Sequence, residues 1–205
     1  MRNIKDASLR WNMPMTEIIP AILPTTTEEL EEKLDTVPRA FQFIQIDIID
    51  EEIYADPVID FEVHFMTETP EKVVDKWVEA GAKRVIVHNL SEKILSLRPE
   101  VEIGLGVEMN IEIEDIYKLV PEVDFVQLMS IEEIGVQGNE FSPKIFDRIK
   151  ELRKEFPEVI ISIDGGVNLE NADDLIHLGV DRLVIGSSIF NTDDPEESYK
   201  DFLKL

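Results

Sequence analysis

The chain has 205 residues, 43% of them hydrophobic, so it can bury one substantial core but is short for two domains. Its 44 acidic and 20 basic residues give a formal net charge of −24, which argues against nucleic acid and anionic membranes as partners. It has no cysteine for disulfides or thiolate catalysis, which fits a cytoplasmic protein, and no apolar run near the roughly 20 residues that cross a bilayer.

Short β-branched segments alternate with segments of helical period along the chain. In chain order we expect strands at residues 17–23, 42–48, 61–66, 84–88, 101–108, 123–129, 159–163 and 182–185. We expect helices at residues 26–37, 70–80, 113–120, 142–156, 169–178 and 195–203, and a short one at 91–97. Eight strands in this alternation predict an α/β fold of the TIM (β/α)8 barrel type.

One connection is too short for the regular pattern. Only about ten residues separate Asp50 from Phe61, which cannot hold a loop, a crossover helix and a second loop. We therefore expect a trimmed barrel, in which the helix between the second and third strands is missing or reduced to a turn. Residues 17–205 would form this single phosphate-binding domain. Residues 1–16 would form an arm or a cap on the barrel bottom, and the apolar bulk of Trp11 favours the cap.

Functional side chains of a TIM barrel gather at the C-terminal ends of its strands. Asp47 ends the second strand and Asp164 the seventh, so the two can face each other across the mouth as an acid–base pair. His64, near the end of the third strand, would add a nitrogen to their oxygens, a donor set for a divalent metal ion. A single aspartate at a strand end is more often a loop cap, and a single histidine there is more often a buried core residue. Spacing alone therefore leaves both the structural and the functional interpretation of these residues open. Other strand ends add Met66, His88, Glu108 and Met129 to the expected substrate pocket.

Two of the strands run directly into glycine. The seventh passes into Gly165-Gly166, and the eighth into Gly186-Ser187-Ser188. Glycine lets backbone N–H groups approach an anion closely, and a following helix adds its positive N-terminal end. Neither loop contains lysine or arginine, so a phosphate bound there would rest on backbone amides.

The strand ends also carry a series of short motifs in a fixed order. They are Pro20-Ala21-Ile22-Leu23, Ile46-Asp47-Ile48-Ile49-Asp50, Val63-His64-Phe65-Met66, Val85-Ile86-Val87-His88, Val126-Gln127-Leu128-Met129-Ser130, Ile163-Asp164-Gly165-Gly166-Val167 and Ile185-Gly186-Ser187-Ser188-Ile189-Phe190. Over residues 18–190 this series resembles the ribulose-phosphate 3-epimerase family. The resemblance implies an isomerase that inverts C3 of a ketopentose 5-phosphate through an enediolate, with one divalent metal ion (Zn, Fe, Mn or Co) as cofactor.

The resemblance also implies roles for individual residues. Asp47 and Asp164 would be the acid–base pair and, with His64, the metal ligands. Met66 and Met129 would form an apolar ceiling over the enediolate. The phosphate would lie on backbone amides near Gly138, Gly165, Gly166, Gly186, Ser187 and Ser188. A phosphorylated sugar would be the partner, and a homodimer is the assembly that the family suggests.

The chain departs from the family pattern around the same rim. The family has a fourth metal ligand, a histidine, two residues before the first aspartate, where this chain has Gln45. Ala21 replaces a substrate-binding serine, and Glu108 replaces a small residue. Two interpretations therefore stand: an active epimerase with an altered metal site, or a barrel that binds a phosphorylated metabolite, with no metal, and does not epimerise it. Decarboxylation or aldol chemistry is disfavoured, because Ile49 stands where a rim lysine would be needed.

Overall fold

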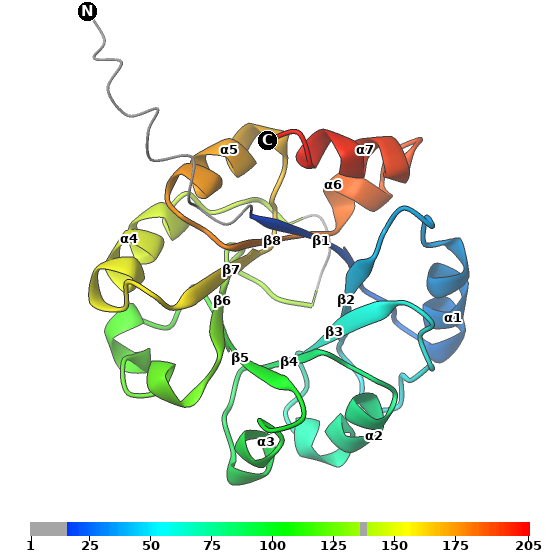
Figure 1. Cartoon of the computed structure of the whole chain (residues 1–205), viewed down its shortest axis with the longest axis horizontal. Coiled ribbons are helices and arrows are strands. Elements are labelled where there is room, and N and C mark those ends of the chain that lie inside the picture. The colour runs from blue at the N-terminus through cyan, green and yellow to red at the C-terminus, as the bar shows by residue number, and fades with distance from the viewer. Residues whose placement is uncertain (1–15, 136–138) are drawn as a thin grey trace, which may run out of the picture.

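A computed structural model describes residues 16–135 and 139–205. Its eight strands pair in parallel, each with its neighbour in sequence, and β1 pairs with β8, so the sheet closes into a barrel (Figure 1). The helices form an outer ring around it (Figure 1). The predicted TIM barrel is therefore confirmed. The expectations for residues 1–15, Trp11 among them, lie outside the described residues.

The observed strands begin and end within two residues of their predicted positions. They are β1 (Glu17–Ile22), β2 (Phe43–Ile48), β3 (Asp60–Phe65), β4 (Arg84–Val87), β5 (Glu102–Val107), β6 (Phe125–Met129), β7 (Ile160–Asp164) and β8 (Arg182–Ile185). Most strand residues are buried, as expected for parallel strands that have a core on one face and helices on the other.

The helices are α1 (Thr27–Thr36), α2 (Val74–Glu79), α3 (Glu92–Ser96), α4 (Ile145–Glu155), α5 (Leu169–His177), α6 (Ser187–Phe190) and α7 (Pro195–Phe202). Single 3-10 turns lie at η1 (Pro70–Lys72), η2 (Ile113–Ile116) and η3 (Val120–Glu122). Side chains that accept from backbone N–H groups cap four of the helices, namely Thr26, Ser91, Asn168 and Asp194.

The predicted helix at residues 113–120 is wrong, since the structure has the separate turns η2 and η3 there. A segment of about eight residues is marginal as a helix on its own, so its packing against the barrel decides its form. The four-residue helix α6 was not predicted, because a single turn is too short to show a helical period.

No helix lies between β2 and β3, as the short connection predicts: residues 49–59 contain only turns, bends and irregular backbone. Ile53 and Ala55 from this connection are buried and join the core where a helix would otherwise pack. Tyr54 packs edge-on against Trp77 of α2 at 5.2 Å between ring centroids. The outer faces of β2 and β3 therefore remain covered despite the missing helix.

The bottom of the barrel is closed by an ion-pair network, formed by Glu17, Glu62, Arg84, Glu102 and Arg182 at or near the first residues of five strands. Arg84 contacts Glu62 at 3.1 Å and Glu17 at 2.9 Å, and Arg182 contacts Glu102 at 3.1 Å. The two guanidinium groups lie over the rings of Phe43 and Phe125. The barrel can therefore open only at its opposite end.

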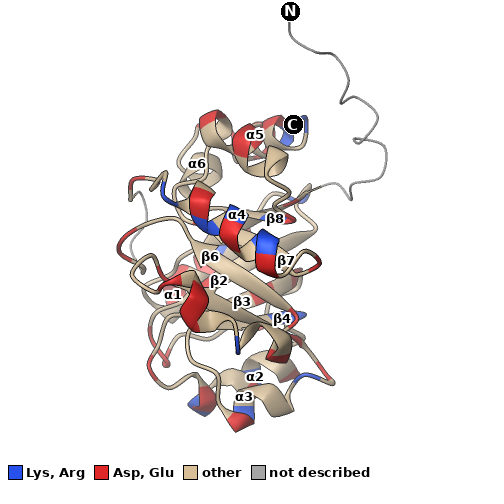
Figure 2. Ribbon diagram, turned by 90° about the vertical axis from the view of Figure 1, so that its left-hand side faces the viewer, with Lys and Arg blue, Asp and Glu red and all other residues tan. Residues whose placement is uncertain are grey.

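Acidic residues are spread over the helices and loops, with basic residues between them (Figure 2). Within the described ranges, the structure contains no helix that is long and apolar enough to span a membrane.

Candidate active site

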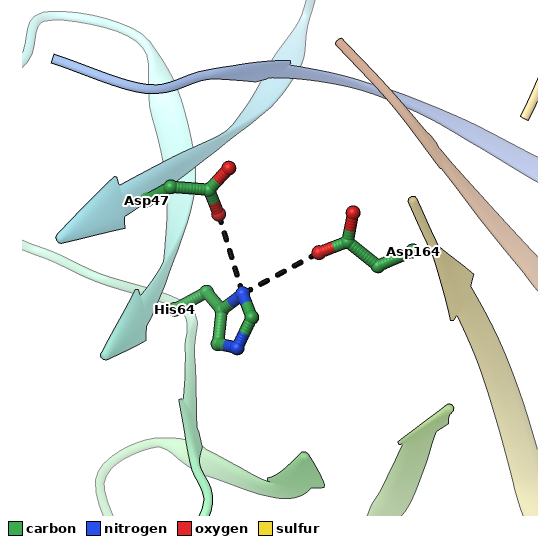
Figure 3. A group of neighbouring side chains, drawn as sticks. All are labelled: Asp47, His64 and Asp164. Carbon is green, nitrogen blue, oxygen red and sulfur yellow. Dashed lines mark ion pairs between the residues drawn. The ribbon is translucent and has the colours of Figure 1, made fainter. Parts of the chain in front are cut away.

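Three predicted site residues meet at the open end of the barrel. Asp47 of β2 and His64 of β3 are register partners, and Asp164 ends β7. The Nδ1 atom of His64 lies 3.3 Å from Asp47 Oδ1 and 3.4 Å from Asp164 Oδ2 (Figure 3). The imidazole side chain is fully buried, whereas 13% of the Asp47 side chain and 12% of the Asp164 side chain are exposed. The carboxylates thus face the mouth and the imidazole supports them from below.

The chemistry of this donor set fits a divalent metal ion. One ligand atom from each of Asp47, His64 and Asp164 lies within 4.8 Å of the others. Carboxylate oxygen and imidazole nitrogen are both common ligands of divalent first-row metals. Three protein ligands also leave coordination positions for a substrate.

Gln45, two residues before Asp47 on the same face of β2, contacts both aspartates. Its Nε2 donates hydrogen bonds to Asp47 Oδ1 at 2.6 Å and to Asp164 Oδ2 at 2.8 Å. The side chain is fully buried, and its Oε1 has no hydrogen-bond partner among the described residues. Gln45, which stands where the resemblance implies a further metal ligand, is therefore part of the cluster.

Sequence reasoning missed Gln127 of β6 as a site residue. Its Nε2 donates to Asp164 Oδ2 at 2.9 Å, and its Oε1 accepts from Ser162 Oγ at 3.2 Å. Alternation could have revealed it, because Gln127 and Ser162 lie two residues before Met129 and Asp164 and share their inward face. Gln127 thus holds one oxygen of Asp164 in place.

The protonation of the cluster follows from burial and close carboxylates. Burial alone would lower the pKa of His64, but hydrogen bonds and charges of Asp164 and Asp47 outweigh it and raise the pKa to about 9. Burial raises the pKa of Asp47 above its usual range, although its hydrogen bond with His64 acts in the opposite direction. At neutral pH the metal-free cluster therefore holds a proton on His64.

His88 lies behind His64. The Nε2 atoms of the two rings are 2.9 Å apart, and His88 Nδ1 lies 3.6 Å from Glu108 Oε1. Burial and the nearby charge of His64 lower the pKa of His88 to about 3, so this ring is neutral. Neither His88 nor Glu108 is among the residues that line the pocket at the mouth, where both are predicted. His88 contacts His64 instead, and Glu108 contacts His88.

A cavity of about 550 Å³, which includes open space at the mouth, lies over the aspartates. Its lining includes Ala21, Met66, Met129, Ile131, Asn139, Gly165, Gly166, Gly186 and Ser187. Both glycine loops therefore border the same space as Asp47 and Asp164. Ser188 is not among the lining residues, and its hydroxyl donates to the carbonyl of Val167 at 2.7 Å. Gly138, the remaining predicted phosphate residue, lies outside the described residues.

The chain is similar to known proteins both in sequence and in fold. The profile of the ribulose-phosphate 3 epimerase family matches residues 17–190. Ribulose-phosphate 3-epimerase of Aquifex aeolicus is 32% identical over 148 residues, which cover 67% of this chain and 66% of that protein. The enzyme of Schizosaccharomyces pombe is 29% identical over 143 residues, which cover 67% of this chain and 62% of that protein.

The chain thus spans less than two thirds of the length of either relative. Among solved structures, KGPDC from Streptococcus mutans superposes with a TM-score of 0.69 at 11% identity, covering 93% of this chain and 98% of that one. At this identity the likeness concerns the fold alone. Because the family profile matches most of its length, the chain belongs to the ribulose-phosphate 3 epimerase family.

Proposed function

We propose that this protein epimerises a phosphorylated ketose at C3, with ribulose 5-phosphate as the first substrate to test. One observation carries the proposal. The carboxylates of Asp47 and Asp164 converge on one imidazole nitrogen beneath a cavity that both glycine loops border. A small substrate held there by its phosphate would have a carboxylate on each side.

In this proposal the two aspartates exchange roles with the direction of the reaction. One carboxylate takes the C3 proton from one face of the sugar, and the other carboxyl group returns a proton to the opposite face. Burial is the main cause that raises the pKa of Asp47, and a raised pKa makes its carboxylate a stronger base than an exposed one.

The remaining lining residues orient the substrate. Backbone amides at Gly165-Gly166 and Gly186-Ser187 would bind the phosphate, and Met66 and Met129 would exclude water from the reacting carbons. Asp47, His64 and Asp164 would hold a divalent metal ion. When bound, such an ion polarises the sugar carbonyl and stabilises the negative charge that follows proton removal.

Gln45 favours a second candidate function, in which the barrel binds a phosphorylated metabolite without epimerising it. Its amide nitrogen already satisfies an oxygen of each aspartate, as a bound cation would. Carboxylates held in this way can remain in place with no metal and no proton transfer.

Isotope exchange separates the two functions. The purified protein is incubated with ribulose 5-phosphate in D2O with Mn²⁺, Co²⁺, Fe²⁺ or Zn²⁺, and NMR follows deuterium at C3 and the appearance of xylulose 5-phosphate. We expect exchange with the native chain and none with Asp47→Asn or Asp164→Asn. Asp173→Asn, a matched change on the exposed surface of α5, should keep full activity.

Phosphate binding is measured on the same samples by calorimetry. Binding of ribulose 5-phosphate without any deuterium at C3, under every metal condition, would replace the epimerase proposal with the second candidate.

A further inference from the structure

Two buried glutamines donate hydrogen bonds to the same aspartate oxygen, but they are held differently. Gln127 has partners at both ends of its amide, Asp164 Oδ2 at Nε2 and the Ser162 hydroxyl at Oε1. Gln45 has partners only at Nε2, while its buried Oε1 meets no hydrogen-bond donor in the described part of the chain. A buried amide oxygen without a donor is costly, so this end of Gln45 requires an explanation.

The position of the Gln45 amide explains why its oxygen has no donor. Its inner atom lies 2.6 Å from Asp47 Oδ1 and 2.8 Å from Asp164 Oδ2. The same two oxygens flank His64 Nδ1 at 3.3 and 3.4 Å. The amide is therefore directed at the position on which Asp47, His64 and Asp164 converge.

The two ends of this amide can exchange places by rotation about a single bond. Rotation by about 180° about the last side-chain torsion, which is broad and roughly two-fold, swaps oxygen and nitrogen. No hydrogen bond is lost at the outer end, because Oε1 has none there now. The inner end loses two hydrogen bonds to carboxylates, and a cation bound between those carboxylates would offset that loss.

We propose that Gln45 is the fourth protein ligand of the metal site, and that cation binding turns its amide so that Oε1 faces the ion. An amide N–H directed at a cation is repelled, whereas an amide oxygen is attracted. The inference rests on the metal site of the proposed function and adds to it a ligand and a class of ion.

The donor set then consists of three oxygens, from Gln45, Asp47 and Asp164, and one nitrogen, from His64. Carboxylate and carbonyl oxygens suit Mn²⁺ and Mg²⁺, whereas imidazole suits Zn²⁺, Fe²⁺ and Cu²⁺. The site is thus assigned to an oxygen-preferring divalent cation, with Mn²⁺ as the probe. An imidazole at position 45 would shift the preference toward Zn²⁺.

Calorimetric titration of the substrate-free, chelator-treated protein with Mn²⁺ and with Zn²⁺ tests this assignment. We expect Gln45→Leu to weaken Mn²⁺ binding on the order of tenfold, the lower end of what loss of a supporting ligand contact costs. We expect Gln45→His to strengthen Zn²⁺ binding relative to Mn²⁺. Gln42→Leu, the same change at an exposed position just before β2, should alter neither affinity.

The direction in which Gln45→Leu changes the Mn²⁺ affinity shows whether the Gln45 amide is a ligand of the cation or competes with it. If the amide nitrogen always faces inward, it competes with the cation, and its removal leaves Mn²⁺ binding as tight or tighter, which overturns the inference. If the leucine variant does not fold, Gln45→Glu replaces it in the test. A carboxylate oxygen at this ligand position should retain Mn²⁺ binding. Loss of Mn²⁺ binding in Gln45→Glu counts against the inference.

The titrations also distinguish this inference from the proposed function. If the native chain binds neither ion, the metal part of the proposed function fails together with the inference. If the native chain binds Mn²⁺ and Gln45→Leu binds it equally well, only the inference fails, and C3 exchange by the native chain remains as the separate measure of catalysis.

Discussion

His64 and His88 face each other through their Nε2 atoms at 2.9 Å. Two imidazole nitrogens at this distance share one proton, so one ring donates and the other accepts. His64 directs its other nitrogen, Nδ1, at the two aspartates. His88 therefore fixes the orientation of the imidazole that completes the cluster, as partners of metal-binding histidines commonly do.

Replacing His88 by phenylalanine should weaken divalent cation binding about 10- to 100-fold, because His64 loses the group that orients it. Calorimetry with Mn²⁺ measures the change, and His88→Gln should recover part of the affinity, since its amide oxygen can accept from His64 Nε2. His177→Phe, on the exposed face of α5, is the control. Equal Mn²⁺ affinity in His88→Phe and the native chain would show that His88 does not orient the ligand.

Gly166→Ala should weaken binding of inorganic phosphate at least tenfold. Gly166 has a φ of +65°, and a Cβ there would lie 2.8 Å from the backbone nitrogen of Phe141, so the loop around Phe141 must move. Gly81→Ala provides the matched control, because its φ is +102° but a Cβ there meets nothing within 4 Å.

Both alanine variants should lose about 1–2 kcal/mol of stability from the left-handed backbone alone. Phosphate titrations followed by calorimetry and thermal denaturation separate the two effects. The prediction is contradicted if Gly166→Ala and Gly81→Ala bind phosphate equally well.

The stability of the protein should depend on Glu62 between about pH 4.5 and 7. Burial raises the pKa of Glu62 to about 7, although Arg84 acts to lower it. In this window the unfolded chain releases the proton while the folded chain retains it, so the contribution of Glu62 to stability falls as pH rises.

Glu62→Gln keeps the shape of the protonated side chain but cannot ionise. Its free energy of unfolding should match that of the native chain near pH 4.5 and exceed it by about 3 kcal/mol above pH 7, because each pH unit between the unfolded and folded pKa of Glu62 corresponds to about 1.4 kcal/mol. Urea denaturation in chelator across this range measures the difference, with Glu170→Gln on the surface of α5 as control. A difference that does not change with pH would show that ionisation of Glu62 is not its cause.

Above pH 7, where Glu62 is ionised, Arg84→Met should destabilise the protein by about 3–5 kcal/mol, because it leaves the buried carboxylate of Glu62 without its 3.1 Å partner. The double variant Glu62→Gln/Arg84→Met should recover much of this loss. The turnover of the folded fraction should remain near the native value, since the network lies at the opposite end of the barrel from the aspartates. Lys83→Met, one residue earlier and exposed, is the control for denaturation.

Much of this fold could be predicted from the sequence, because it depends on local patterns. Strand positions followed from short β-branched runs, and the missing helix after β2 followed from the length of residues 49–59, which no packing can extend. The helix at residues 113–120 was predicted from an apolar period over only about eight residues, which is too short to fix a helix, and the backbone there forms two separate 3-10 turns.

The contacts of the candidate site were harder to predict than its members. Asp47, His64 and Asp164 were found at strand ends, but the link from Gln45 to Asp164 joins residues 119 positions apart across the barrel. Strand tilt and stagger decide which inward side chains meet, and neither is written in any one segment. The pairing of His64 with His88 and the role of Gln127 therefore became visible only in three dimensions.

The acidic surface has a consequence for how a substrate arrives. Under the proposed function, a sugar phosphate with two negative charges would approach a chain of net charge −24 and would be repelled until it reached the backbone amides at the mouth. Salt screens repulsion over distances of about 10 Å at 0.1 M, but it affects neutral amides at contact much less. The association rate constant, measured by stopped flow, should therefore rise with ionic strength while the dissociation rate constant changes little, so that encounter is faster in a saline medium than in a dilute one.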